Sequence, residues 1–192
     1  MKIVMIGAPG SGKGTQANRL TARLGVPVIS TGEILRSEVN SGSELGRAAE
    51  RTMNVGGYVA DHIVDAIVCD RLIRNECSQG FILDGYPRTV DQIASLDATL
   101  ARATSKLDAA VHLVVDRDEI RRRLLKRGKE QGRSDDTAET IERRLDTYFR
   151  SALPLVQEYA VRGVLVEADG SGEPEAVHAR LVLALLRLER AG

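Results

Sequence analysis

The segment Gly7–Lys13 reads GAPGSGK, directly after an apolar run at Lys2–Ile6 and directly before a helical pattern. This arrangement satisfies the pattern G-x-x-x-x-G-K in its required strand–loop–helix context. Glycines let successive backbone N–H groups curve around a phosphate, and the positive end of the following helix faces the same anion. Lys13 adds a full positive charge for the terminal phosphates of a nucleotide. The residues expected to bind these phosphates are Gly10, Ser11, Gly12, Lys13, Gly14 and Thr15.

One departure from the general pattern concerns the metal ion that accompanies nucleotide phosphates. Position 14 is Gly, where the pattern has Ser or Thr to bind Mg²⁺, and Thr15 comes one residue later. We therefore expect Mg²⁺ to be held largely through water, with Thr15 contributing in that way. The signature N-K-x-D, which reads the base in GTPase switches, is absent from the sequence, and this argues against that class.

The elements that must position this loop are predicted by the alternation of short apolar runs with longer amphipathic stretches. The runs are Lys2–Ile6, Pro27–Ser30, Phe81–Asp84, Ala109–Asp116 and Gly163–Glu167. They are rich in Val and Ile and mostly lack a two-residue period, which is typical of strands covered on both faces. Because helical patterns separate them, the sequence predicts an α/β fold with a five-stranded parallel sheet flanked by helices.

The overall composition predicts one soluble domain. Among 192 residues, 27 Lys and Arg balance 27 Asp and Glu. A neutral chain with 3% aromatic residues fits neither a nucleic-acid partner nor a polybasic membrane anchor. No window approaches the roughly 18 consecutive apolar residues of a membrane span. Cys69 and Cys77 lack C-x-x-C spacing, so we expect no structural zinc and a reducing, cytoplasmic environment.

Further motifs follow the phosphate-binding loop in order along the chain. After GAPGSGKGTQ come STGEILR from Ser30, GYVAD from Gly57, DGYPRT from Asp84 with Gln92, RLLKRG from Arg123, GRSDD from Gly132, RRL from Arg143 and DGSG from Asp169. With these motifs the chain resembles adenylate kinases and related nucleoside monophosphate kinases from Met1 to about Val177. It resembles their short-lid form, since the expected lid is only a few residues long.

The resemblance implies a three-layer P-loop NTPase fold in one kinase domain, residues 1–192. The core would comprise 1–29, 60–126 and 137–192, with a helical NMP-binding segment at 30–59 and a lid at 127–136. The sequence itself agrees in part. Thr31–Tyr58 has a helical pattern without a strand, and Gly128–Asp136 is polar with two glycines, as in a loop. Pro154 is expected to bend or end the helix that follows the lid.

Basic residues supply the charge that transfer of a phosphoryl group between two nucleotides requires. Guanidinium groups bind phosphate oxygens in pairs, and the resemblance places Arg36 and Arg88 on the α-phosphate of AMP. Arg123 and Arg127 lie four residues apart and share a helix face. Around the lid, the resemblance implies a closing clamp. The implied catalytic residues are Lys13, Arg88, Arg123, Arg133 and Arg144, while Arg123, Arg127 and Gly172 would also contact ATP.

Selection of adenine is assigned by the resemblance to Thr31 and Gln92. A glutamine amide donates and accepts at once, as the adenine N1/N6 edge requires. Asp84 ends a predicted strand and resembles a carboxylate that orders Mg²⁺, in this chain through water. The other implied AMP-binding residues are Gly57, Tyr58, Val59, Gly85, Tyr86, Pro87, Arg133 and Arg144. Glu33, Ala60 and His62 stand where the family more often has Asp, Pro and Glu.

The implied reaction is Mg·ATP + AMP ⇌ 2 ADP, catalysed by a monomer. Its nucleophile is an ionised phosphate oxygen, so no general base is needed. We therefore interpret His112 as a hydrogen-bonded core residue, and His62 and His178 as surface residues. Two alternatives remain: a UMP/CMP-type kinase, which Thr31 and Gln92 disfavour, and a nucleotide-sensing switch, which the second set of phosphate-binding arginines disfavours. A partner scaffold has no positive signal in the sequence.

Overall fold

The computed structural model describes residues 1–131 and 137–191. Its centre is a sheet of five parallel strands in the order β2-β3-β1-β4-β5. Their bounds are β1 Lys2–Ile6, β2 Val28–Ser30, β3 Phe81–Asp84, β4 Ala109–Val114 and β5 Leu165–Asp169. The predicted α/β class with its five-stranded parallel sheet is confirmed. Three strands differ in their bounds: β2 begins one residue later than expected, β4 ends two residues earlier, and β5 lies two residues later.

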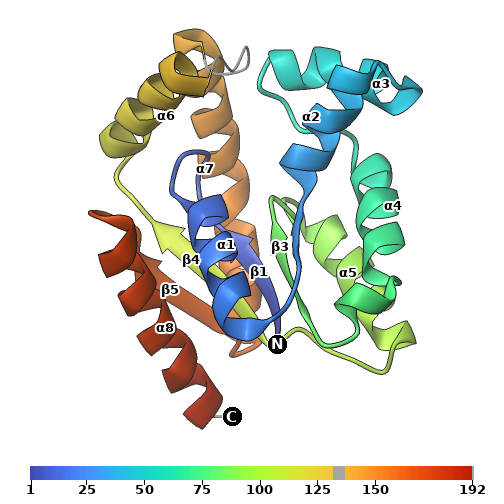
Figure 1. Ribbon diagram of the computed structural model, residues 1–192, viewed down its shortest axis with the longest axis vertical. Coiled ribbons are helices and arrows are strands. Elements are labelled where there is room, and N and C mark those ends of the chain that lie inside the picture. The colour runs from blue at the N-terminus through green and yellow to red at the C-terminus, as the bar shows by residue number, and fades with distance from the viewer. Residues whose placement is uncertain (132–136, 192) are drawn as a thin grey trace.

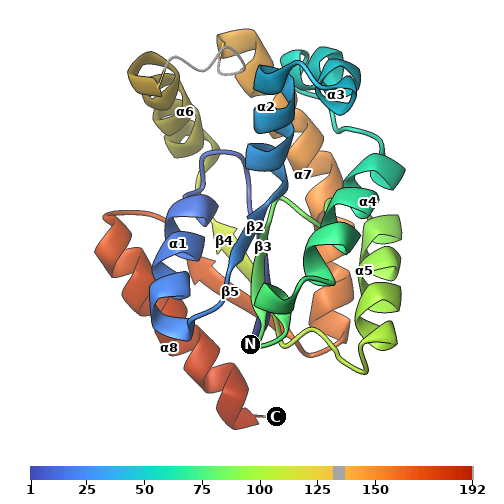
Figure 2. The same cartoon turned by 45° about the vertical axis from the view of Figure 1, so that its right-hand side comes forward.

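Helices cover both faces of the sheet and extend beyond its carboxyl edge (Figures 1 and 2). They are α1 Lys13–Leu24, α2 Thr31–Ser41, α3 Glu44–Asn54, α4 Asp61–Leu72, α5 Val90–Arg102, α6 Arg117–Gln131, α7 Ala138–Val161 and α8 Pro174–Ala191, with a short 3₁₀ turn, η1, at Asn75–Cys77. None of the described helices is long and apolar enough to cross a membrane.

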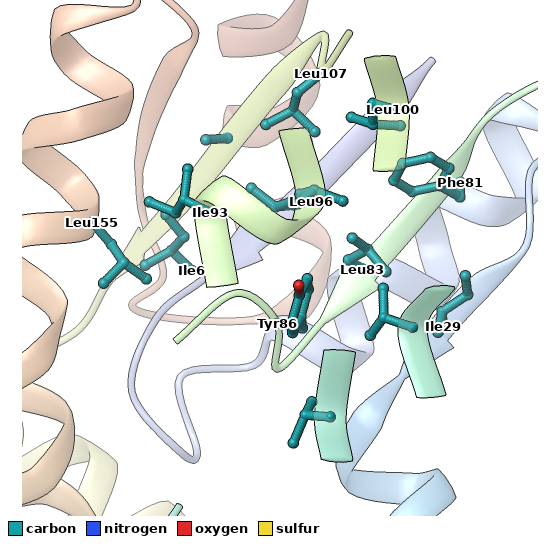
Figure 3. Packing of buried hydrophobic residues seen from close by; sticks show 14 of the residues in the cluster. Ile6, Ile29, Phe81, Leu83, Tyr86, Ile93, Leu96, Leu100, Leu107 and Leu155 are labelled. Atoms are coloured by element: carbon teal, nitrogen blue, oxygen red, sulfur yellow. The ribbon is translucent and has the colours of Figure 1, made fainter. Parts of the chain in front are cut away.

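Alternate residues of the strands belong to the two faces, and this alternation builds three layers. Val4 and Ile6 of β1 pack into a cluster with apolar residues of α4, α5 and α7. Ile3 and Met5 of the same strand pack with α1 and α8. Figure 3 shows the first cluster, in which Ile93 and Leu96 of α5 lie over the strands. The apolar runs lack a two-residue period because both faces of each central strand are buried.

A third, smaller cluster supports the phosphate-binding loop. Ala8 packs with Ile120 and Leu124 of α6 and with Ile141 and Leu145 of α7. The loop therefore rests on the two helices that flank the predicted lid. Their packing couples the position of the loop to the position of these helices.

The helical prediction for residues 31–58 is correct over most of its length. Helices α2 and α3 meet at a sharp turn, where Gly42 adopts a left-handed conformation and the Ser43 hydroxyl accepts a hydrogen bond from Gly46 N at 2.9 Å. The helical part ends at Asn54, so the segment that leads to α4 is irregular. In Figure 1, α2 and α3 lie on the opposite side of the molecule from α6.

Two helices continue through residues where the sequence suggested that they could end. Helix α6 continues to Gln131, so the first residues of the expected loop are helical, while 132–136 lie outside the described residues. An ion pair between Lys126 and Glu130 at 3.8 Å spans Gly128, which by itself costs about 1 kcal/mol in a helix. Pro154 lies inside α7. The buried face of this 24-residue helix offsets the lost backbone hydrogen bond.

Candidate active site

A cavity of about 630 Å³ opens at the carboxyl edge of the sheet, where ligands bind in open α/β folds. It is lined by most of the residues that the sequence singled out. These are Gly10, Ser11, Gly12, Lys13, Gly14, Thr15, Thr31, Arg36, Gly57, Tyr58, Val59, Asp84, Gly85, Pro87, Arg88, Gln92, Arg123, Arg127 and Arg144. The fold therefore brings the phosphate-binding loop and the second set of predicted residues around one space.

The amino end of α1 is built to receive an anion. Gly12 occupies the N-cap position with φ of 96°, contributes no side-chain hydrogen bond to the helix, and no acidic residue lies in the first turn. Gly10 also has a positive φ, and a Cβ there would lie 2.7 Å from Cγ of Leu124. The helix thus presents uncapped backbone N–H groups to the cavity, which is the arrangement that binds phosphate.

Lys13 begins this helix, and its ammonium group folds back over the loop. Its Nζ donates to the carbonyl oxygen of Ala8 at 2.9 Å. Removal from water lowers the pKa of Lys13 to about 8, and Asp84 opposes this shift while Arg88 and two further arginines add to it. A bound phosphate would favour the charged form and raise this pKa again.

Asp84 ends β3 and faces the same helix end. One of its carboxylate oxygens, Oδ2, lies 3.4 Å from the point where a side chain at Gly14 would begin. Gly14 thus leaves room between the carboxylate and the helix. Within 1–131 and 137–191, no group of three or more His, Cys, Asp or Glu residues could hold a metal. One carboxylate beside a phosphate site fits Mg²⁺, which keeps most of its waters and binds substrate phosphates.

Arg88 is oriented by the loop after β3 and by the irregular segment before α4. Its Nε donates to the Gly85 carbonyl oxygen at 2.7 Å, and its guanidinium lies 4.8 Å from the centre of the Tyr58 ring. The Tyr58 hydroxyl lies 3.2 Å from Oγ of Ser151 on α7. These contacts aim one guanidinium plane into the cavity that Arg36 also lines.

The two residues predicted to select the base, Thr31 and Gln92, are buried and line the same cavity. Thr31 is 1% exposed, and its hydroxyl donates to the Gly85 carbonyl oxygen at 3.0 Å. Gln92 is 2% exposed, and both ends of its amide are hydrogen-bonded within the protein. Thr31 is the first residue of α2, and Gln92 lies in the first turn of α5. The amino-terminal ends of two helices therefore supply these two side chains.

The arginines beside the predicted lid come from α6 and α7. Arg123 pairs with Glu119 at 2.7 Å and donates through Nη1 to the Gly170 carbonyl oxygen at 3.1 Å. Arg127, one turn farther along α6, and Arg144 of α7 line the same cavity. Arg133, the remaining predicted arginine, lies outside the described residues.

Two predicted residues are not among the cavity's described lining. Tyr86 is 1% exposed, and its hydroxyl donates to Asp65 Oδ1 at 2.7 Å, so its ring belongs to the core. Gly172 is exposed in the turn before α8. Gly170 of the same motif lines the cavity instead, and a Cβ on it would lie 3.3 Å from the Ser11 carbonyl oxygen.

Sequence reasoning missed lining residues that the other helices contribute. They include Gln16 of α1, Ser151 of α7, and Pro174 and Val177 of α8. Gln16 directly follows the phosphate-binding motif, which was the one available signal. Its Nε2 donates to the Pro174 carbonyl oxygen at 2.9 Å, which ties α1 to the start of α8.

The histidines are absent from the lining of this cavity. His112 bonds to Glu167 at 3.0 Å and to the Tyr148 hydroxyl at 3.1 Å, as expected of a hydrogen-bonded core residue. His178 was expected at the surface but is partly buried, and its Nδ1 lies 3.2 Å from Oε1 of Gln16 on α1. Burial lowers the pKa of His178, which favours its neutral form.

Comparison with known proteins identifies the family. A model described as "Adenylate kinase" matches residues 5–164. The adenylate kinase of Leifsonia xyli subsp. xyli is 45% identical over 183 residues, covering 95% of this chain and 92% of the relative. That of Kocuria rhizophila is 46% identical over 97% of this chain and 99% of its own length. That of Stenotrophomonas maltophilia strain R551-3 is 45% identical over 96% and 99%. The chain therefore belongs to the adenylate kinase family.

Proposed function

We propose that this chain catalyses the reversible, Mg²⁺-dependent transfer of the γ-phosphoryl group of ATP to AMP, giving two ADP. The observation that carries this proposal is the lining of one cavity by two phosphate-binding sets. The first is the loop that ends in Lys13, and the second contains Arg36 and Arg88. A protein that binds a single nucleotide has no use for the second set.

In the proposed reaction, an oxygen of the AMP α-phosphate forms a bond to the γ-phosphorus of ATP. The bond from that phosphorus to the β–γ bridging oxygen breaks, and ADP leaves. The attacking oxygen is already ionised, so the site needs charge and alignment rather than a base. Arg88 would orient the acceptor phosphate, while Lys13 and Arg123 would neutralise the charge that shifts toward the β-phosphate.

Asp84 and Thr15 would order the waters of a Mg²⁺ ion bound with ATP, and this ion would neutralise the β- and γ-oxygens when present. The geometry of Asp84 beside Gly14 supports this role. Gly172, Tyr86 and Arg133 remain proposals from the family resemblance. For Tyr86, the supporting feature is the backbone of the loop between β3 and α5, since its ring is buried.

We further propose that residues 30–59 and 127–136 move against the core when both nucleotides bind. Closure would exclude water from the transferred phosphate. Fluorescent labels on α3 and on α1 should approach each other when a bisubstrate dinucleoside pentaphosphate is added. Unchanged distances would contradict closure.

A monomeric state is also proposed, together with a cytoplasmic location, which the free thiols of Cys69 and Cys77 support.

The acceptor is tested by comparing kcat/KM for AMP, CMP, UMP and GMP with ATP as donor in a coupled assay. We expect AMP to be preferred, because Thr31 and Gln92 line the cavity beside Arg88. Faster turnover of CMP or UMP would replace this proposal with a pyrimidine monophosphate kinase. A dinucleoside pentaphosphate should also bind far more tightly than ATP, whereas equal affinities would favour a one-nucleotide switch.

A further inference from the structure

The protein itself holds the side-chain amide of Gln92 in one orientation. The backbone N–H of Arg88 donates to Oε1 of Gln92 at 2.7 Å. Nε2 of Gln92 donates to Oδ1 of Asp61 at 2.8 Å. Each end of the amide thus has a partner of fixed hydrogen-bonding character: a backbone N–H can only donate, and a carboxylate can only accept.

The reversed amide is incompatible with these partners. It would set its NH₂ group against the Arg88 N–H and its oxygen against the Asp61 carboxylate. Gln92 is 2% exposed, so water could not relieve either contact. An unsatisfied buried polar group costs more than a typical hydrogen bond gains. The network therefore admits one orientation.

Asp61 is itself well anchored. Its second oxygen, Oδ2, accepts from the Thr89 hydroxyl at 2.6 Å. Thr89 is the N-cap of α5, and its hydroxyl accepts from Gln92 N at 3.2 Å. Asp61 is also the first residue of α4, where a negative charge is favoured by the helix dipole. Asp61 thus joins the starts of two helices around the amide of Gln92.

The fixed amide has one N–H and one oxygen lone pair left for a ligand. Adenine offers a 6-amino donor beside the N1 acceptor, whereas a 6-oxopurine offers an acceptor beside an N1–H donor. The two edges require opposite amide orientations. We propose that Asp61 is a positioning residue that locks the Gln92 amide for a 6-aminopurine monophosphate and against a 6-oxopurine monophosphate. This inference rests on the proposed function, in which Gln92 faces the acceptor base.

The test is the ratio of kcat/KM for AMP to that for inosine monophosphate, measured at fixed, saturating ATP. A correct pair of base hydrogen bonds provides about 5- to 150-fold discrimination. We expect Asp61→Ala to lower this ratio by about tenfold or more. The KM for AMP should rise, while kcat/KM for inosine monophosphate should increase or should fall less than that for AMP. The KM for ATP should stay unchanged. Asp61→Asn, whose oxygen can still accept from Nε2, should restore most of the ratio.

Asp65 provides a matched control one turn along α4. Its carboxylate accepts from the Tyr86 hydroxyl at 2.7 Å and from the Ser95 hydroxyl at 2.9 Å, without touching the Gln92 side chain. Asp65→Ala removes an equally bonded carboxylate, so it should leave the ratio unchanged whatever it does to stability. An unchanged ratio in Asp61→Ala, or an equal narrowing in Asp65→Ala, would overturn the proposal.

A measurement on the unaltered protein covers the case in which Asp61→Ala does not fold. The side-chain amide protons of Gln92, assigned by their loss in Gln92→Glu, should exchange slowly with solvent by NMR. The exposed Gln79 supplies the fast-exchanging reference within the same chain. Exchange of Gln92 as fast as that of Gln79 would refute the lock. Failure of the proposed function would look different, since the unaltered protein would then not prefer AMP among the monophosphates.

Discussion

The guanidinium of Arg88 shows how single residues in this site are oriented by their neighbours. The Gly85 carbonyl oxygen holds its Nε, and the ring of Tyr58 lies against its plane. A Cβ on Gly85 would lie 2.8 Å from the Thr31 hydroxyl and 3.1 Å from Nη2 of Arg88, and its φ is +84°. Glycine at position 85 is therefore required by the close approach of the Thr31 hydroxyl and the Arg88 guanidinium as well as by the positive φ of the backbone.

For Arg88→Ala we expect kcat with AMP to fall by about 100-fold or more, as when a preorganised donor is removed from a transition state. Arg88→Lys should recover only part of the loss, because an ammonium cannot form the paired contacts of a guanidinium. Initial rates at saturating ATP measure both variants. Arg102→Ala, at the exposed end of α5, is the control. Near-normal turnover in Arg88→Ala would remove this residue from the site.

A second prediction concerns the charge on Lys13. Because the pKa of Lys13 is lowered to about 8, the ligand-free protein loses this charge as the pH rises above about 8. Phosphate binds the charged form, so binding of ATP should take up a proton there. We expect the Kd for ATP to increase above pH 8, by at most about tenfold per pH unit. Calorimetry between pH 7 and 9.5 measures this dependence.

Lys13→Arg is the control for this pH dependence, since a guanidinium stays charged throughout that range. The affinity of this variant for ATP should be weaker, because the altered side chain no longer fits the loop. Its Kd for ATP should nevertheless change less with pH than that of the unaltered protein. A profile in the unaltered protein as flat as that of Lys13→Arg would show that Lys13 does not titrate with a pKa near 8.

At the scale of elements, the irregular segment after α3 is placed by its contact with α7. Gly56 has φ of +75°, and a Cβ on it would lie 2.9 Å from Cγ of Arg144 and 3.1 Å from the Thr140 carbonyl oxygen. The Thr140 hydroxyl also donates to the Asn54 carbonyl oxygen at 3.4 Å. This close approach sets where the predicted NMP-binding segment rejoins the core.

Gly56→Ala and Gly42→Ala separate packing from backbone strain. Gly42 has a similar φ of +66°, but no atom lies within 4 Å of a Cβ built on it. Both substitutions force alanine into the left-handed region, whereas only Gly56→Ala overpacks its surroundings, which typically adds about 1–3 kcal/mol. Urea denaturation should show the larger loss for Gly56→Ala, accompanied by a higher KM for AMP. Equal losses of stability in the two variants would mean that the segment around Gly56 can move away from α7 without cost, and this would contradict the prediction.

Sequence patterns predicted element types better than element ends. The strand–loop–helix context of Gly7–Lys13 and the apolar runs identified the sheet and α1, because burial of both strand faces leaves a direct mark on composition. Gly128 does not end α6 and Pro154 does not end α7, since the local cost of each residue is offset by the packing of these helices against the loop and the core. That packing joins residues far apart in the chain and has no local signature.

At the scale of the whole molecule, the neutral total of 27 basic and 27 acidic residues hides a local excess of positive charge. Lys13, Arg36, Arg88, Arg123, Arg127 and Arg144 line one cavity, and the acidic residues in the described part of its lining are Glu33 and Asp84. On the outer surface, ion pairs such as Arg74–Asp70 and Arg19–Glu175 join opposite charges. Outside this described lining the chain has 21 basic and 25 acidic residues, so the positive charge is concentrated in the cavity, where it attracts anions, and the rest of the chain is net acidic.

Salt should therefore weaken catalysis more than it weakens folding. Raising ionic strength from about 0.05 to about 0.5 M shortens the screening length to a few ångströms, so we expect kcat/KM for AMP to fall several-fold. The Tm of the ligand-free protein should change little, because exposed ion pairs contribute little to stability. Steady-state rates measure the effect on catalysis, and thermal unfolding measures the effect on stability. The ratio of chloride to sulfate is held constant in both series. A parallel loss of both would contradict the charge separation.

The sequence by itself determined the class of the sheet and the phosphate-binding loop before α1, because both follow from local spacing and burial, whereas most of the other cavity residues were implied by the family resemblance of the motifs. The tertiary structure decided which of these residues meet. It moved the ring of Tyr86 into the core, brought Gly170 rather than Gly172 to the cavity, and joined Asp61 to the Gln92 amide across the starts of α4 and α5. Those outcomes depend on how helices pack and on hydrogen bonds between distant segments, which residue spacing along the chain does not encode.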